Sequence, residues 1–360
     1  MDLKVHKIAT KRKDATMKKI LVAAALTMAA APAAMASKAR VNALAGSRQI
    51  VDIQTAFDRP YQFMALNTMA TIEWGSADTK AATPGAVTEA TPHAEGGFLM
   101  KSDDMAYGAY LGRRSEAFST VVDASGIAGL LNEQNPINLY YASKMGEWTW
   151  GVTVKYSNGK DELNAGGATA EASSSGLALG ATNGTWDVEL VQGLTGKSEL
   201  GADSVESKGM TQIGVGYKIN DKMEAYGKYG MVKADITSGG TDSTYEQSGF
   251  ELGFVNTVVN AEGANFFYGV AYSSGKIEDQ AEVSALPVWM GIEADATSWM
   301  VMRASVKQNI IINETKVTAA NDAKVNIDSI DFNAGLGLKL GKGMLDASFG
   351  TANAGHLSFS

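Results

Sequence analysis

The chain has 360 residues, and its 31 Lys and Arg against 39 Asp and Glu give a net charge of −8 at pH 7. This acidic balance argues against nucleic acid as a partner. The sequence contains no cysteine, which excludes disulfides and thiolate chemistry. Core packing or the closure of a sheet must therefore stabilise the fold.

The N-terminal region has the pattern of an export signal. Lys18-Lys19 precede an almost entirely apolar run that ends in the small-x-small sequence Ala34-Met35-Ala36. A basic start, a short apolar stretch and such a cleavage pattern predict a secretory signal peptide over Met17–Ala36, cleaved after Ala36. The mature chain would begin at Ser37. Because the signal is complete without residues 1–16, we interpret them as a spurious extension.

From about residue 69 the chain becomes a series of segments in which apolar and polar side chains alternate. Clear examples are residues 148–156, 213–219, 250–254 and 332–340. Successive side chains of a strand point to opposite faces, so each segment has one apolar and one polar face. A soluble β-sandwich would show the same alternation. Here, however, the polar set is rich in glycine and small residues, and aromatic residues stand at segment ends.

Short and long connections alternate along this series, as in outer-membrane barrels with periplasmic turns and extracellular loops. The predicted short connections are Ser102–Asp104, Gly146, Asn183-Gly184, Asn220-Asp221, Val259–Gly263, Ala296-Thr297 and Gly341–Gly343. The predicted long ones are Ser76–Ala94, Ser115–Pro136, Asn158–Ala172, Thr195–Val205, Ala234–Tyr245, Ile277–Glu282 and Ile311–Asn326.

We therefore expect an all-β fold, a transmembrane antiparallel β-barrel of about 16 strands with short periplasmic turns and long extracellular loops. The first strand is Met69–Gly75 and the last is the short segment His356–Ser360. If these two did not form, the barrel would have 14 strands. The chain then divides into residues 1–36, a periplasmic or plug-like segment over 37–68, and the barrel over 69–360.

The polar face of the predicted strands supplies a set of candidate pore-lining residues with nearly balanced charge. They are Lys155, Asp187, Glu189, Lys218, Glu224, Lys228, Glu251, Glu293, Arg303, Lys307, Asp331 and Lys339. A slip of one residue in register would turn each charge toward lipid, at a cost of about 2–4 kcal/mol at the bilayer midplane. Because the signs nearly cancel, we expect no strong ion selectivity from the wall alone.

The connection Ser115–Pro136 differs from the others because it carries many apolar side chains at roughly helical spacing. An amphipathic loop must shelter its apolar face, and the barrel lumen is the nearest place. We predict a short helix that folds inward and narrows the channel, with Asp123 or Glu133 facing the permeation path. Packing on other loops or on a second protomer is the alternative.

The mature chain offers little for catalysis. His93 and His356 are its histidines, and it contains no Gly-x-Ser-x-Gly sequence. The carboxylates Glu293 and Asp295 share a strand face, but a solvated lumen pair explains them. We expect no enzyme activity, no cofactor and no metal site.

Several N-terminal motifs resemble a known family. Arg40–Gln49, Asp58-Arg59-Pro60-Tyr61 and Ala70-Thr71-Ile72-Glu73-Trp74-Gly75 are similar to the porin-like major outer-membrane proteins of the predatory bacterium Bdellovibrio. The resemblance implies an abundant barrel that serves as a general porin or a structural surface protein.

A fainter resemblance is to the long-chain fatty-acid transporter barrels, in which an N-terminal segment ending in an Asn-Pro-Ala-like motif plugs the barrel. Asp58-Arg59-Pro60 occupies the place of that motif here and lacks its Asn and Ala.

The sequence thus favours an exported outer-membrane channel for passive diffusion of small hydrophilic solutes. Two alternatives stay open: a plugged barrel that transports hydrophobic compounds, and a structural or adhesive barrel without an open pore. The expected partners are outer-membrane lipid, small solutes, the outer-membrane assembly machinery and, in a homo-oligomer, copies of the same chain.

Overall fold

The computed structural model describes residues 37–75, 93–162, 169–261, 264–317, 323–325, 330–350 and 356–359. The predicted signal peptide and the segment before it lie outside these residues, as does most of the predicted loop Ser76–Ala94.

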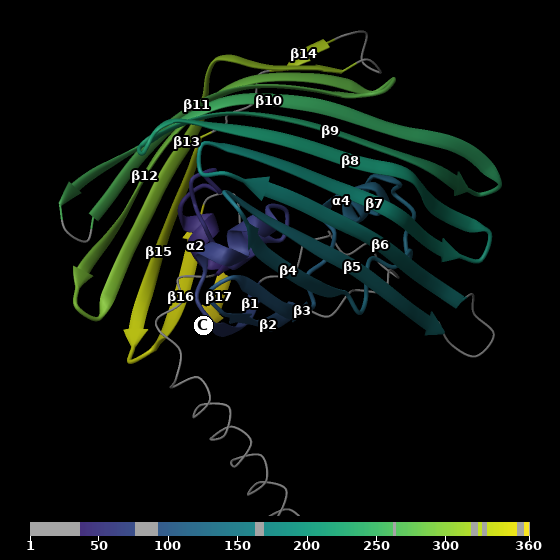
Figure 1. Cartoon of the computed structure of the whole chain (residues 1–360). Helices are drawn as coiled ribbons and strands as arrows, with labels where there is room; N and C mark the ends of the chain where they lie inside the picture. Colours follow the sequence, from purple (N-terminus) through teal and green to yellow (C-terminus); the bar gives the residue numbers. More distant parts are fainter. Residues whose placement is uncertain are drawn as a thin grey trace, which may run out of the picture.

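The described strands form one antiparallel sheet that closes on itself (Figure 1). Each strand pairs with its neighbours in the chain, and the first strand also pairs with the last. The strands are β1 (Met69–Gly75), β2 (His93–Lys101), β3 (Met105–Leu111), β4 (Ile137–Met145), β5 (Trp148–Glu162), β6 (Thr169–Thr182), β7 (Trp186–Leu200), β8 (Asp203–Asn220), β9 (Met223–Ser238), β10 (Thr241–Ala261), β11 (Ala264–Ile277), β12 (Ala281–Thr297), β13 (Met300–Val317), β14 (Ala323–Val325), β15 (Asp331–Leu340), β16 (Gly343–Gly350) and β17 (His356–Phe359).

The described part of the barrel wall has sixteen strands. β14 pairs with the C-terminal end of β13, at Thr315–Val317, and β15 pairs with its N-terminal end, at Met300–Lys307. These two strands therefore occupy one place in the barrel wall. The prediction of about 16 strands is confirmed. The alternative of 14 is wrong, because both β1 and β17 take part in closing the sheet.

The two ends of the barrel differ, and here several predicted boundaries are corrected. Tight turns join β2 to β3, β4 to β5 and β6 to β7, as predicted. At the other end, much of the sequence predicted as long loops is strand: β7 runs to Leu200 and β8 begins at Asp203. The outward positions of these parts are polar, and apolar residues such as Val205 and Ile236 point inward, so the outward apolar stripe that marks the rest of the wall is missing. Cross-strand ion pairs such as Lys160–Glu171, at 3.2 Å, line the hairpins instead.

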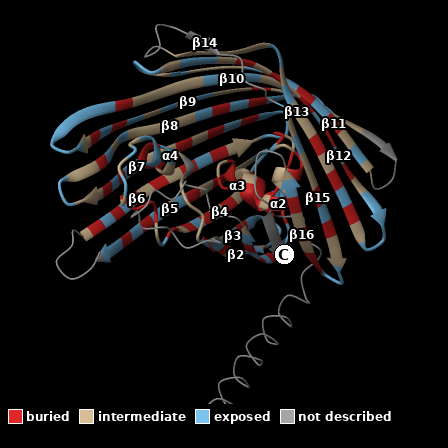
Figure 2. Cartoon of the chain, turned by 180° about the vertical axis from the view of Figure 1, so that it is seen from behind, coloured by how far each residue is buried: buried red, intermediate tan, exposed pale blue. Residues whose placement is uncertain are grey.

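The outer face of the wall is apolar, as a bilayer requires. Buried and exposed residues alternate along the strands (Figure 2), and the exposed positions carry large apolar side chains. Examples are Ile72, Tyr107, Val154, Leu252 and Leu336, each between 41% and 59% exposed. In the described part of the chain, no helix is both long and apolar enough to cross a membrane.

The segment before β1 lies inside the barrel, where Figure 1 shows it in purple beneath the curved sheet. It comprises α2 (Lys38–Ala43), α3 (Ile53–Ala56) and the 3-10 helix η1 (Pro60–Ala65). We call residues 37–67 the plug. α2 contacts β13, β15, β16 and β17, whereas η1 contacts β3, β4, β5 and β6. The plug therefore bridges opposite parts of the wall.

Glycines on the inner face let the plug approach the wall closely. A Cβ atom at Gly180 would lie 2.9 Å from the ring of Tyr61, and one at Gly335 would lie 2.7 Å from the Cβ atom of Ala43. Side chains at these two positions would push the plug away. The small residues on the polar register therefore make room for the plug.

An apolar core anchors the second half of the plug. Phe57 and Phe63 are fully buried against Tyr110 of β3 and Tyr140 of β4. The rings of Phe63 and Tyr140 stack with their centroids 4.1 Å apart. Aromatic pairs of this kind contribute about 0.5–1.5 kcal/mol beyond their burial. The plug is thus packed as a protein interior is.

The orientation of the wall yields a test with a matched control. Replacing Leu252 with Arg puts a charge on the lipid face, at a cost of about 2–4 kcal/mol near the midplane. Replacing Gly230 with Ser changes the inner face, where a new Cβ atom meets nothing closer than 3.9 Å. We expect Leu252→Arg to reduce the heat-modifiable folded form on gels and Gly230→Ser to leave it unchanged. Equal assembly of both variants would contradict the orientation.

Candidate functional site at the plug and the barrel wall

All twelve residues proposed from sequence as pore-lining lie on the inner face. Seven of them form ion pairs with the plug or the wall: Lys155 with Asp58, Asp187, Glu189 and Glu224 with Arg48, Glu293 with Arg40, Arg303 with Asp346, and Lys339 with Asp295. Glu251 accepts a hydrogen bond from the Tyr226 hydroxyl at 2.8 Å. Lys228, Lys307 and Asp331 share the inner register, and Lys218 lines the cavity described below.

Arg48 of the plug is the centre of the largest charged contact. Its Nε donates to Glu224 Oε1 at 2.6 Å, its Nη1 donates to Glu189 at 3.4 Å, and its Nη2 donates to Asp187. The Arg48 side chain is 2% exposed. Arg59 supports this arrangement, because it donates to the Arg48 carbonyl oxygen at 2.7 Å. One plug residue thus joins β7 to β9 through three carboxylates.

A second contact faces β1, β2 and β3. Glu73 and Glu95 are direct cross-strand partners and both are buried. Gln54 of the plug donates to each of them at 2.9 Å, and Lys38 forms an ion pair with Glu95 at 2.7 Å. Two adjacent carboxylates would repel each other without these donors, so the plug is needed to satisfy this part of the wall.

Two cavities lie between the plug and the wall. One of about 580 Å³ opens near the tight turns, and its lining includes Arg48, Lys218, Glu224 and Phe267. The other, which we call the outer cavity, has a volume of about 390 Å³, and its lining includes Lys155, Gln212 and Gly230. It lies nearer the opposite end of the barrel, toward the long hairpins β5–β6, β7–β8 and β9–β10, which we call the tall hairpins. Both cavities touch the inner face of β7, β8, β9, β10 and β11.

A short stretch of the inner wall separates the two cavities. On β7, Asp187 borders the first cavity and Val191 the second, so Glu189 lies between them. On β9, Tyr226 and Lys228 lie between the residues that line the two cavities, and on β10 Glu251 and Gly253 do so. This stretch therefore carries charges of opposite sign, on Glu189, Lys228 and Glu251, beside the neutral side chain of Tyr226.

The predicted inward helix is present. α4 (Glu116–Ala124) packs against β8 through a buried cluster that includes Phe118, Val121 and Val205. Glu133 is buried and accepts hydrogen bonds from Ser174 and from the backbone of Ser115, so it holds the connection in place. Asp123 is exposed and accepts a hydrogen bond from Asn132 at 3.1 Å.

Sequence reasoning missed the plug's charged residues and their wall partners. A signal was present: residues 37–67 carry Lys38, Arg40, Arg48 and Arg59 against Asp52 and Asp58, a net charge of +2 in an acidic chain. Trp289 also stood apart, as an aromatic residue in a polar register. Its indole nitrogen donates to Ser47 of the plug at 2.7 Å.

Within the described residues, no group of three or more His, Asp or Glu side chains is arranged to hold a metal ion.

No protein-family model matches the chain, and no curated protein matches it. Among solved structures, it is similar to a FadL homologue of Pseudomonas aeruginosa, with 11% identity, 92% of this chain and 98% of that chain covered, and a TM-score of 0.44. It is also similar to the outer-membrane expressed OmpT of Vibrio cholerae, with 12% identity, 81% and 96% covered, and a TM-score of 0.39. The Pseudomonas putida toluene transporter TodX gives 11% identity, 91% and 97% covered, and 0.38. The strand pairing, and not these low TM-scores, establishes the barrel fold.

The Arg48 contact predicts a large loss of stability from one substitution. Arg48→Met keeps the apolar stem but removes the cation that Asp187, Glu189 and Glu224 share. Arg59 then remains beside Glu189 at 4.0 Å, and the expected cost is about 3–5 kcal/mol. The measurement is denaturant unfolding of the detergent-folded barrel, followed by tryptophan fluorescence. Lys197→Met is the control, since Lys197 pairs with Glu199 on the solvent-exposed end of β7. We expect no resolved change there, and equal effects of the two variants would contradict the account.

Proposed function

We propose that the protein is an outer-membrane channel for small hydrophilic solutes, in which the plug confines passage to a narrow route along β7 to β11. One observation carries the proposal: two cavities border the same strands of the inner wall, and the short stretch between them carries charges of both signs. In this proposal, a solute moves from one cavity to the other along Glu189, Lys228 and Glu251.

The membrane setting follows from the outer face and the predicted export signal. The apolar exterior fits lipid, and closed sheets are one of the two structures that can cross a bilayer without unpaired backbone groups. We place the tight turns in the periplasm and the tall hairpins outside the cell, as in other barrels of this kind. Insertion would require the outer-membrane assembly machinery. The resemblance to the porin-like proteins of Bdellovibrio agrees with this class.

The chemistry of the route favours polar solutes. Carboxylates, guanidinium groups and lysines border both cavities, and a hydrophobic compound would have to displace water from these groups without replacing their hydrogen bonds. The opposed signs at the layer favour uncharged or weakly charged molecules, since a strongly charged solute meets repulsion from one sign or the other.

A plugged transporter of hydrophobic compounds is the second candidate. The observation in its favour is the part of the outer cavity formed by Val121, Val191 and Val232. Three apolar side chains on one side of a cavity could hold an apolar group while the other side stays polar. The two candidates differ in a measurable way, because only a hydrophilic route conducts ions.

Filling the outer cavity should reduce conductance. Gly230 of β9 lies on the inner face and pairs with Gly249 of β10, which in turn pairs with Gly275 of β11. Gly230→Trp would place an indole in the cavity, whereas Tyr229→Trp on the adjacent outward position would face lipid. We expect single-channel conductance in planar bilayers to fall several-fold for Gly230→Trp alone. Conductance that is absent in the native protein, or equal in both variants, would contradict a hydrophilic route.

Deleting α4 should have the opposite effect. Ala117, Thr120 and Val121 line the outer cavity, so the helix narrows its mouth. A variant that lacks Ala117–Leu131 should conduct more than the native protein when its barrel folds to the same heat-modifiable form. Unchanged conductance in that folded variant would remove α4 from the route.

A further inference from the structure

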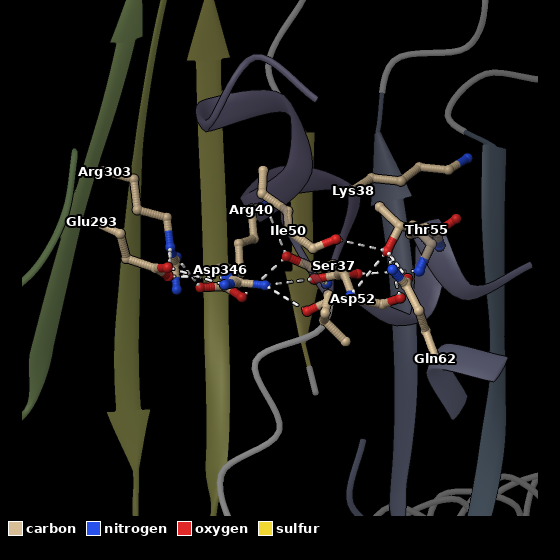
Figure 3. A network of polar contacts seen from close by, with 12 residues as sticks. Ser37, Lys38, Arg40, Ile50, Asp52, Thr55, Gln62, Glu293, Arg303 and Asp346 are labelled. Carbon is tan, nitrogen blue, oxygen red and sulfur yellow. Dashed lines mark hydrogen bonds and ion pairs between the residues drawn. The ribbon is translucent and has the colours of Figure 1, made fainter. Parts of the chain in front are cut away.

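Ser37, the first residue of the plug, belongs to a closed ring of polar and charged groups near the tight-turn end of β12, β13 and β16 (Figure 3). Its members follow one another in space and come from distant parts of the chain. In order they are Ser37, Asp52, Arg40, Glu293, Arg303 and Asp346.

Each neighbouring pair in the ring is in contact. Arg40 binds Glu293 with Nε at 2.9 Å and Nη2 at 3.0 Å, and its Nη1 lies 3.4 Å from Asp52. Arg303 donates to Glu293 at 2.8 Å and to Asp346 at 2.6 Å. Ser37 closes the ring.

Ser37 contacts both of its acidic neighbours. Its backbone nitrogen donates to Asp52 Oδ2 at 3.0 Å, and its hydroxyl donates to Asp346 Oδ2 at 3.0 Å. Ser37 and Asp52 have no exposed surface, and Asp346 is 1% exposed. The serine nitrogen is therefore held at hydrogen-bonding distance from a carboxylate that has no access to bulk water.

In the uncleaved chain, the ring contains one positive charge fewer than it contains negative charges. It holds three carboxylates and two guanidinium groups, and its sixth member is the neutral amide of Ser37. Each carboxylate contacts a guanidinium group, but the six members together keep one net negative charge in a buried place, which is costly. In agreement, burial raises the pKa of the Asp52 carboxyl to about 6, although Arg40 acts in the opposite direction.

We propose that removal of the signal peptide supplies the missing charge, and that the new α-ammonium group of Ser37 locks the plug into the barrel. Water adds across the Ala36–Ser37 peptide bond in the reaction that signal peptidase catalyses. The Ala36 carbonyl leaves as a carboxylate, and the Ser37 nitrogen becomes an amine that takes up a proton near neutral pH. Three positive charges then balance three negative ones.

The consequence is an order of events. The uncleaved precursor lacks the third cation, so its plug docks less firmly than the plug of the mature chain. Cleavage both releases the chain for export and completes the contact that seats α2 against β16. The proposal depends on the position of the plug and on cleavage after Ala36, and it does not depend on whether the barrel conducts.

The direct test is the reactivity of the α-amino group. The mature protein, purified from outer membranes and folded in detergent, is treated near neutral pH with a small amine-acylating reagent. Mass spectrometry of the peptide 37–51 then follows modification of the terminal amine. Only the unprotonated amine reacts, so each unit by which the ring raises its pKa slows the reaction about tenfold. We expect at least that slowing relative to the unfolded protein, while the exposed amine of Lys197 reacts alike in both states.

Displacing the ammonium group provides a second, independent measurement. Inserting one glycine between Ala36 and Ser37 moves the new terminus one residue away from Asp52. The matched control inserts one glycine between Gly239 and Gly240, in the turn between β9 and β10. We expect the first insertion to lower the temperature at which the folded gel band converts to the unfolded one and to speed terminal acylation. The control should change neither.

Three results would overturn the proposal. One is a mature terminus other than Ser37. Another is a Ser37 amine in the folded barrel that reacts as fast as in the unfolded chain. The third is a terminal insertion that has no more effect than the control insertion. Loss of conductance in these variants would bear on the proposed channel and not on this ring.

Discussion

The constraint on which this structure depends is that acidic groups on the inner wall need cations, and the plug supplies them. Glu73, Glu95 and two of the three carboxylates around Arg48 are buried, and the third, Glu224, is 14% exposed, so water cannot solvate these groups fully. An empty barrel of this sequence would hold these groups in unpaired clusters and would pay for it in shifted protonation or lost stability. The basic segment 37–67 is thus as much a part of the wall's electrostatics as the strands are.

In the proposed channel, this dependence limits which solutes can pass. Buried ion pairs contribute little net stability compared with apolar packing, but they fix one arrangement because every alternative leaves a charge unpaired. The plug packs by Phe57 and Phe63 on one side and is held by charge on the other. The charged side faces β7 to β11, where the two cavities lie. Any opening that enlarges the route would begin by exchanging ion pairs for water, which costs less than exposing the aromatic core.

The sequence predicted the barrel well because alternation depends only on the two faces of a strand. It predicted β1 to the residue and placed all twelve candidate lining residues on the inner face. It failed where the outward face is polar, as in the hairpin after Gly193, since such strands lack the outward apolar stripe. The site was harder still. Which carboxylates Arg48 would reach depends on how a segment without regular periodicity folds within a closed space, and no local pattern specifies that.

The central claim is that residues 37–67 fill the lumen, and the absence of cysteine from the chain allows a direct test. Ser47 is 4% exposed in the plug, and Ser298 is exposed in the turn between β12 and β13. Each is replaced by cysteine in a separate variant, and the folded proteins are treated with a membrane-impermeant, hydrophilic thiol reagent. The account predicts rapid labelling of Ser298→Cys and slow labelling of Ser47→Cys until the barrel is unfolded. Equal labelling of both folded variants would mean that the segment lies outside the barrel and would contradict the account.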